Sequence, residues 1–205
     1  MLAAIDLEGV LAPEIWPYLG DQFSIPELHL TTRDSDDFDA LMKTRVDAMN
    51  RAGLTLADLQ RVAHRVQPYL GAPEFLKQIR QYCQVMIISD TFHEFATPLM
   101  ERLGGVNLFA NRFVVDEQGR ISGWALRIRG RKSMVVQGMK QAGFKIIGMG
   151  DSLNDLTLLQ SADYPILFRP VQRLRDEVPN APVVEGLDEA LAAFMAIFKR
   201  NGDFA

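Results

Sequence analysis

Short apolar runs alternate along the chain with longer stretches in which apolar residues recur every three or four positions. The runs are four residues long and rich in Ile, Val, Leu and Met, as expected of strands buried in a parallel sheet. They cover residues 2–5, 85–88, 146–149 and 165–168. The longer stretches have helical spacing, over residues 38–49, 56–66, 72–82, 132–142 and 187–198. This alternation predicts an α/β fold with a doubly wound, mainly parallel, Rossmann-like sheet.

Local signals mark the ends of some of these elements. Thr55 followed by Asp58 resembles a capping box at the start of the second predicted helix, and Pro73 suits the first turn of the third. Residues 113–116 and 121–126, joined around Gly119, predict a β-hairpin.

Residues 14–71 contain no convincing strand, and they are too many for a simple loop. We therefore predict a core domain formed by residues 1–13 and 72–205. The segment 14–71 is predicted to be a small inserted α-helical cap domain over the carboxyl edge of the sheet.

Acidic side chains follow two of the predicted strands directly. Asp6 and Glu8 come after the first run, and Asp151 and Asp155 come after the run at 146–149. In an open α/β sheet, ligands bind at the carboxyl ends of the strands. Carboxylates gathered there suggest a site for a hard metal ion beside an attacking group, and one carboxylate can itself be the nucleophile.

Composition narrows the class of partner. The chain has 205 residues, 48% of them hydrophobic and 23% charged, which is ordinary for a globular protein. A net charge of −4 gives no reason to expect nucleic acid or an anionic membrane as partner. No apolar run is long enough to span a bilayer, and the one cysteine, Cys83, fits a reducing compartment. We therefore expect a cytoplasmic protein that binds small molecules; its oligomeric state stays open.

The chemistry-bearing residues form an ordered set. Asp6 and Glu8 come first, then Ser89 after the second run, then Lys132, and then Asp151 with Asn154 and Asp155 in a Gly-Asp-Ser run. This order and spacing resemble the motif set of the haloacid dehalogenase superfamily of phosphohydrolases.

A closer likeness covers about residues 3 to 195. Its matching stretches are residues 6–14, Thr31-Thr32-Arg33-Asp34, residues 41–43, Ser89-Asp90-Thr91-Phe92 and the Gly-Asp-Ser run. They resemble the bifunctional branch of phosphoserine phosphatase/homoserine phosphotransferases. The resemblance implies phosphate transfer from phosphoserine to water or to homoserine through an aspartyl-phosphate.

The resemblance also implies the catalytic roles. Asp6 is the expected nucleophile, and Glu8 the acid toward the leaving oxygen and then the base toward the acceptor. Glu8 stands where most members of the superfamily carry aspartate. Ser89 is expected to donate a hydrogen bond to a phosphate oxygen. Lys132 is expected to balance the charge on the nucleophile and the phosphoryl group.

The implied cofactor is Mg²⁺, held by Asp6, Asp151 and the backbone carbonyl of Glu8, with Asp155 completing the acidic set around the ion or its waters. In the cap, Arg45 is expected to bind the α-carboxylate of the substrate and Glu14 its ammonium group. The remaining expected substrate contacts are Phe38 against the substrate backbone, Asn154, and Asp90, whose specific role stays open.

Two other functions are compatible with the residues. The chain could hydrolyse another small phosphomonoester, with the same nucleophile and a different cap specificity. It could also be a phosphate-sensing module without turnover, although such a module has no need of the Glu8 acid/base.

Overall fold

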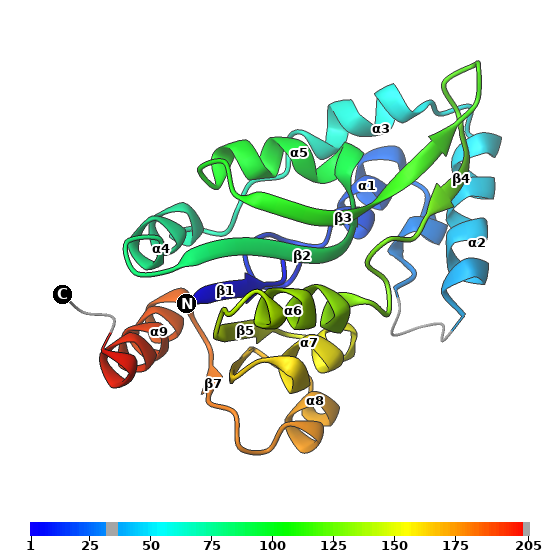
Figure 1. Cartoon of the computed structure of the whole chain (residues 1–205). Helices are drawn as coiled ribbons and strands as arrows, with labels where there is room; N and C mark the ends of the chain where they lie inside the picture. The colour runs from blue at the N-terminus through cyan, green and yellow to red at the C-terminus, as the bar shows by residue number, and fades with distance from the viewer. Residues whose placement is uncertain (32–36, 203–205) are drawn as a thin grey trace.

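The computed structural model describes residues 1–31 and 37–202 and confirms the α/β class (Figure 1). Its described strands form one sheet in the order β4-β3-β2-β1-β5-β6-β7, parallel except for the antiparallel β3–β4 pair. The strands are β1 (Leu2–Ile5), β2 (Gln84–Phe92), β3 (Asn107–Val115), β4 (Ile121–Ala125), β5 (Ile146–Gly150), β6 (Tyr164–Phe168) and β7 (Val183–Val184).

Helices cover both faces of the sheet because alternate strand residues point to opposite sides. Ala3 and Ile5 of β1 pack in the larger core with α4 (Ala72–Ile79), α5 (His93–Arg102) and α9 (Leu187–Asn201). Leu2 and Ala4 pack in the second core with α6 (Lys132–Gln141), α7 (Leu156–Ser161) and α8 (Gln172–Glu177). The central strand is therefore buried throughout.

The strand order reverses at β1. From β1 the chain builds outward through β2 and β3 on one side, and later through β5, β6 and β7 on the other. The loops that follow β1 and β5 consequently lie side by side, and the backbone N–H of Asp6 donates to the carbonyl of Met149 at 3.0 Å. Such a reversal is where open α/β sheets bind their ligands.

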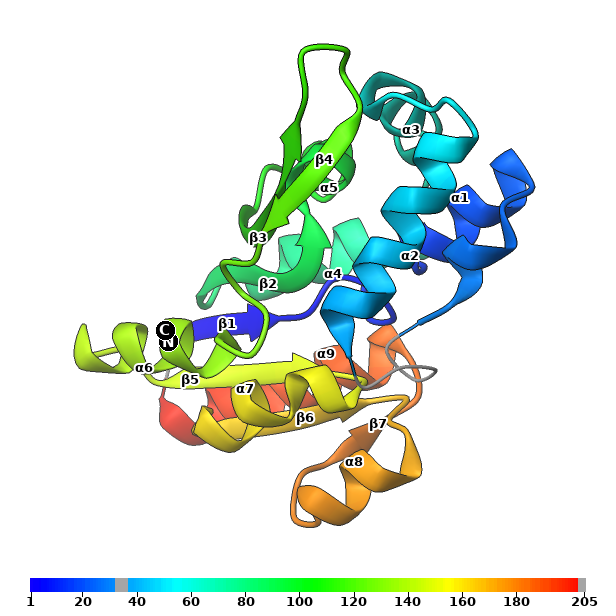
Figure 2. The ribbon, with the colours of Figure 1, turned by 90° about the vertical axis from the view of Figure 1, so that its right-hand side faces the viewer.

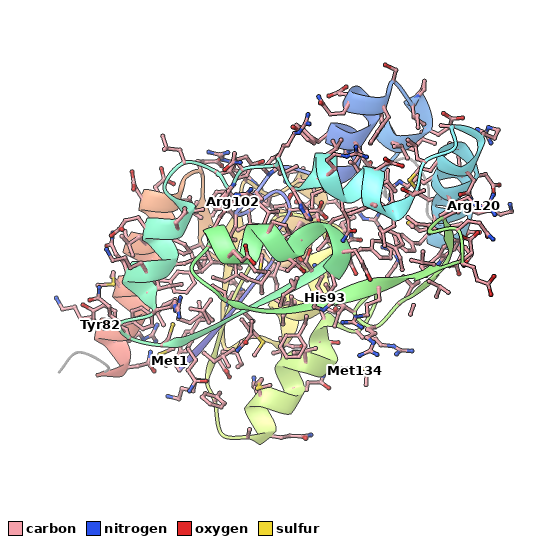
Figure 3. All side chains as sticks on the ribbon, turned by 90° about the horizontal axis from the view of Figure 1, so that it is seen from above. Met1, Tyr82, His93, Arg102, Arg120 and Met134 are labelled. Carbon is pink, nitrogen blue, oxygen red and sulfur yellow. The ribbon has the colours of Figure 1, made fainter. Side chains whose placement is uncertain are left out.

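A helical segment stands beyond the carboxyl end of β1, next to the β3–β4 hairpin (Figures 1 and 2). It holds α1 (Ile15–Phe23), a 3₁₀ helix η1 (Pro26–His29), α2 (Phe38–Arg51) and α3 (Leu56–Ala63). The Trp124 indole on β4 donates to Asp39 of α2 at 2.9 Å, and Asn50 of α2 donates to the carbonyl of Ile121 at 3.2 Å. Figure 3 labels Met1 and Tyr82 near the amino ends of β1 and β2, and Arg120 at the opposite side, in the hairpin turn beside α2.

Some boundaries differ from the sequence prediction. The capping box of Thr55 and Asp58 is confirmed, but α3 ends at Ala63 and α4 at Ile79, each followed by a turn that keeps Val66 and Tyr82 against the core. The predicted hairpin is confirmed, yet β3 begins at Asn107, because its first half pairs in parallel with β2.

The strand β2 also continues beyond the predicted apolar run, through Ser89 and Asp90 to Phe92. Its pairing with β3 is irregular between Ile88 and Phe92. An irregularity of this kind can turn side chains such as those of Ser89 and Asp90 away from the directions they would have in a regular strand. Such irregularities are common beside active sites.

Within residues 1–31 and 37–202, no helix is long and apolar enough to cross a membrane.

Candidate active site

Three carboxylates meet where the strand order reverses. Asp6 follows β1, Asp151 follows β5, and Asp155 closes the short 3₁₀ helix η2 (Leu153–Asp155). All three are buried, and one oxygen of each lies within 4.8 Å of the others. Gly9 adopts a φ of +84°, and a Cβ atom there would collide with the Asp151 carboxylate. The glycine lets the two acidic loops approach each other.

Lys132, the first residue of α6, links these carboxylates. Its buried Nζ lies 2.9 Å from Asp6 Oδ1, 2.7 Å from Asp155 Oδ1 and 3.8 Å from Asp90 Oδ2. Burial opposes the charge on Lys132, but the carboxylates of Asp155, Asp6 and Asp90 outweigh it and raise its pKa well above the ordinary value. The site therefore keeps a cation in contact with Asp6.

Asp155 stabilises the acidic loop that follows β5. Its Oδ2 accepts hydrogen bonds from the backbone N–H of Asp151 at 3.0 Å and of Ser152 at 3.2 Å, and from the Ser152 hydroxyl at 3.4 Å. Its Oδ1 accepts from Lys132. A Cβ atom at Gly150 would collide with the Asp155 side chain, so close packing requires glycine there. With both oxygens engaged by protein donors, Asp155 holds the loop in place.

Burial and the neighbouring Glu14 carboxylate raise the pKa of Glu8 to about 8, against a smaller lowering by the Ile15 backbone N–H, Arg45 and Lys132. The Ile15 N–H donates to Glu8 Oε1 at 2.8 Å and fixes the side chain in the cavity. At neutral pH the metal-free protein therefore favours a protonated Glu8, which can donate a proton.

Glu8→Gln should weaken the pH dependence of stability in the metal-free protein. As the pH rises from the ordinary value of 4.5 toward about 8, the unfolded chain releases the Glu8 proton while the folded chain keeps it. The free energy of unfolding therefore falls across this window, and glutamine removes that contribution. Thermal melting with EDTA should show the wild-type protein losing stability relative to Glu8→Gln between about pH 5 and about pH 8.

The matched control for that experiment is Glu117→Gln, because Glu117 lies exposed in the hairpin turn. A Glu8→Gln curve parallel to that of the wild type would contradict the assignment of a protonated, buried Glu8.

Arg45 of α2 is a buried cation of the site. Its Nη2 donates to the carbonyl of Leu30 at 2.6 Å, and its guanidinium lies 4.4 Å from the centroid of the Trp16 ring. Its Nε is buried and has no hydrogen-bond partner within residues 1–31 and 37–202. Burial lowers the pKa of Arg45 to about 10, with Glu8 and Glu14 acting in the opposite direction, so the side chain stays charged at neutral pH.

These elements enclose a cavity of about 340 Å³. The structure brings almost every sequence-predicted site residue to its wall. Those lining it are Asp6, Glu8, Glu14, Phe38, Arg45, Ser89, Asp90, Lys132, Asp151 and Asn154. Asp155 is the exception, since it lies fully buried behind Lys132 and the Asp151 loop. The buried Ser89 hydroxyl accepts from the backbone N–H of Thr91 at 3.3 Å and keeps its own hydrogen free to donate.

Other lining residues were not singled out from the sequence. They include two cations, Arg129 and Arg173, together with Trp16. Arg129 lies in the connection between β4 and α6, where no periodic pattern marks it. Of the matching stretch at residues 31–34, only Thr31 is described; Thr32, Arg33 and Asp34 lie outside the described residues.

Asn111 of β3 is a further residue that sequence reasoning missed. It is fully buried, donates to the carbonyl of Asp90 at 2.8 Å, and accepts from the backbone N–H groups of Arg127 and Ile128 at 2.9 and 3.0 Å. One side chain thereby ties the irregular end of β2 to the loop that leads to Lys132. A buried amide whose nitrogen and oxygen are both hydrogen-bonded is typical of a position that fixes a site.

Comparisons with known proteins agree with this geometry. The chain is 41% identical over 200 residues to a phosphoserine phosphatase of Pseudomonas syringae pv. tomato, covering 98% of this chain and 84% of that protein. It is 38% identical to the phosphoserine phosphatase ThrH of Pseudomonas aeruginosa, covering 98% of both. No protein-family model matches the chain.

Solved structures share the fold. A phospho-aspartyl intermediate analogue of phosphoserine phosphatase superposes with a TM-score of 0.77 at 21% identity, covering 93% of this chain and 97% of that one. A substrate-bound phosphoserine phosphatase gives the same TM-score at 20% identity, with 93% and 96% coverage. Because its 41% and 38% identity to these two relatives extends over 98% of its length, this chain belongs to the phosphoserine phosphatase family of the haloacid dehalogenase superfamily, in the branch that includes ThrH.

Proposed function

We propose that this protein is a Mg²⁺-dependent phosphoserine phosphatase that also transfers the phosphoryl group to homoserine through an aspartyl-phosphate on Asp6. The observation that carries the proposal is the contact between Asp6 and the buried Lys132 at the floor of a cavity whose walls bear Glu8 and Arg45. A nucleophile, a cation, a proton donor and a carboxylate-binding group thus face one space.

The two half-reactions use Asp6 and Glu8 in turn. A carboxylate oxygen of Asp6 attacks phosphorus, the bond to the serine oxygen breaks, and protonated Glu8 gives its proton to that oxygen. A hydroxyl group of water or homoserine then attacks phosphorus, gives its proton to Glu8 and releases Asp6. Lys132 offsets the negative charge that gathers on Asp6 and the phosphoryl oxygens, and the Ser89 hydroxyl donates to one of them.

We propose that residues 14–71 form a cap domain and that this cap recognises the substrate. The Arg45 Nε–H has no partner among the described residues, so a bound α-carboxylate would supply an acceptor. Glu14, exposed at the start of α1 and lining the cavity, would take the ammonium group. Phe38 and Asn154 would bound the substrate from α2 and η2.

The acidic cluster fits a hard divalent cation. Oxygen donors in a buried set are the ligands that Mg²⁺ prefers, and the set of Asp6, Asp151 and Asp155 carries more negative charge than Lys132 alone offsets. We propose Asp6 and Asp151 as direct ligands with the carbonyl of Glu8, and Asp155 as the residue that holds their loop. Bound there, Mg²⁺ would supply the positive charge that lets a carboxylate approach a phosphate.

Chelation should abolish turnover, and added Mg²⁺ should restore it. In Asp151→Asn the loss of one anionic ligand should raise the Mg²⁺ concentration for half-maximal activity at least about tenfold. The readouts are phosphate release and the rise in melting temperature on Mg²⁺ addition, which should be smaller in Asp151→Asn. Glu117→Gln, at the exposed position in the hairpin turn named above, is the control. Full activity in EDTA would contradict the metal requirement.

The proposed function is tested by incubating the protein with phosphoserine and Mg²⁺, with and without homoserine, and measuring free phosphate and phosphohomoserine separately. Phosphohomoserine formed at the expense of free phosphate is the expected result. Free phosphate alone would leave a plain phosphoserine phosphatase. If neither forms, a panel of other small phosphomonoesters separates an altered specificity from a module without turnover.

Glu8→Asp should lower the ratio of phosphohomoserine to free phosphate. Aspartate is shorter by one methylene, which withdraws the carboxyl group by about one carbon–carbon bond and changes which acceptor hydroxyl is well placed. The same two-product assay measures the ratio, with total turnover as the internal reference. An unchanged ratio would mean that the length of this side chain does not govern the choice of acceptor.

A further inference from the structure

Among the described residues, one carboxylate oxygen of the cavity has no hydrogen-bond donor. Asp90 Oδ1 is buried and has no partner in residues 1–31 and 37–202, while Oδ2 faces Lys132 at 3.8 Å. That separation is well beyond the 2.7 and 2.9 Å at which Lys132 contacts Asp155 and Asp6. A buried carboxylate oxygen left without a donor is costly, so a bound ligand with an N–H or O–H group would be favoured there.

The cavity also contains a cation without an acidic partner. The Arg129 guanidinium lies 3.9 Å from the centroid of the Phe38 ring, and within the described part of the chain no carboxylate forms an ion pair with it. Stacking on an aromatic ring orients a guanidinium and leaves its in-plane N–H groups available for a carboxylate.

The Asn111 side chain connects the segments that carry Asp90 and Arg129. Asn111 binds the backbone carbonyl of Asp90 and, through its other amide atom, the backbone N–H groups of Arg127 and Ile128. Asp90 and Arg129 therefore line the cavity from neighbouring, mutually fixed segments. Burial raises the pKa of Asp90, and the charges of Lys132 and then Arg129 act against that rise.

We propose that Asp90 and Arg129 form a second recognition pair for an amino-acid head group, which binds the acceptor of the phosphoryl group. Asp90 Oδ1 accepts a hydrogen bond from the α-ammonium group, and Arg129 binds the α-carboxylate. This assignment rests on the proposed function, and it separates the acceptor from phosphoserine, whose head group belongs to Glu14 and Arg45.

The charge and the volume of the cavity are consistent with two recognition pairs for amino-acid head groups. Asp6, Asp90 and Asp155 surround a single ammonium group, so the floor of the site favours a further cation near Asp90. The cavity of about 340 Å³ is within the range of sites that hold drug-sized ligands, which are larger than one amino acid. Each amino acid can therefore have its own contacts.

The variants Asp90→Asn and Arg129→Met test the pair by comparing the KM for homoserine with the KM for phosphoserine. Each variant should raise the KM for homoserine about tenfold or more, the effect of losing one charge-assisted contact. The KM for phosphoserine, measured by phosphate release without homoserine, should rise far less than the KM for homoserine, because Glu14 and Arg45 are intact. Arg131→Met, an exposed arginine two residues from Arg129, is the matched control and should change neither constant.

The desamino acceptor 4-hydroxybutyrate separates the two contacts. It lacks the ammonium group, so Asp90→Asn should leave its KM unchanged while Arg129→Met raises it. An equal rise in the KM for phosphoserine and homoserine would overturn the proposal in favour of one shared head-group site. No change in either constant would also overturn it.

Failure of the proposed transfer to homoserine can be distinguished from failure of the Asp90 and Arg129 pair. If the unaltered protein hydrolyses phosphoserine but forms no phosphohomoserine, transfer fails, and calorimetry with L-homoserine in Mg²⁺ then decides the pair. Binding that is lost in Asp90→Asn and kept in Arg131→Met would support it. Binding that is absent, or equal in both variants, would overturn it.

Discussion

Asp6→Asn is expected to lose turnover by a factor of about 10⁴ or more, with no phospho-enzyme formed. The neutral amide cannot attack phosphorus, and no other carboxylate takes its place at the end of β1, because Asp155 is engaged by Lys132 and the Asp151 loop. The measurements are kcat with phosphoserine and acid-stable labelling of the protein from radioactive phosphoserine.

Loss of folding would not account for that result. Burial and the carboxylates of Asp155 and Asp151 raise the pKa of Asp6, against the opposing Lys132, so an amide relieves repulsion in the metal-free protein. The melting temperature in EDTA should therefore be no lower than that of the wild type. Labelling retained in Asp6→Asn would place the nucleophile elsewhere.

Lys132→Met should lose both activity and stability. Methionine fills a similar volume but leaves Asp6, Asp155 and Asp90 as buried carboxylates without their shared cation. Removing one partner of a buried ion pair costs about 3–5 kcal/mol, and loss of charge compensation in the transition state adds a fall in kcat of about 10³-fold. Denaturant unfolding in EDTA measures the first effect, and phosphoserine turnover in Mg²⁺ the second.

The double variant Asp6→Asn/Lys132→Met is the control for that stability effect. It removes the cation together with one of its anions, so its destabilisation should be smaller than that of Lys132→Met alone. Mg²⁺ should also recover part of the stability of the single variant. Equal destabilisation of the single and double variants would mean that the contact between Asp6 and Lys132 contributes little.

The residues at strand ends were predictable because two independent signals coincide there. An apolar run fixes where β1 and β5 end, and the acidic residues that follow must then lie at one edge of the sheet. The reversal of strand order at β1 brings Asp6 and Asp151 together without any signal in the residues between them. Lys132 was predicted from the order of motifs, and its position at the start of α6 places it against both acidic loops.

Arg129 and Asn111 could not be predicted in the same way. Arg129 sits in an irregular connection, so its position depends on the hairpin that precedes it. Asn111 lies before the hairpin strand predicted at residues 113–116, and its burial follows from the parallel pairing of β3 with β2, which local sequence does not encode. The boundaries of the cap, the cytoplasmic location, the lack of nucleic-acid and membrane partners and the individual residue roles stay predictions.

The position of β1 at the centre of the sheet has a consequence during synthesis. Lys132 and Asp151, which lie beside Asp6 in the folded protein, are synthesised about 125 and 145 residues after it, on the order of ten seconds at typical rates of translation. Until β5 emerges, β1 has a neighbour on one side only. We therefore expect a growing or truncated chain that lacks β5 to show no phosphoserine turnover, because its Asp6 has no Asp151 beside it.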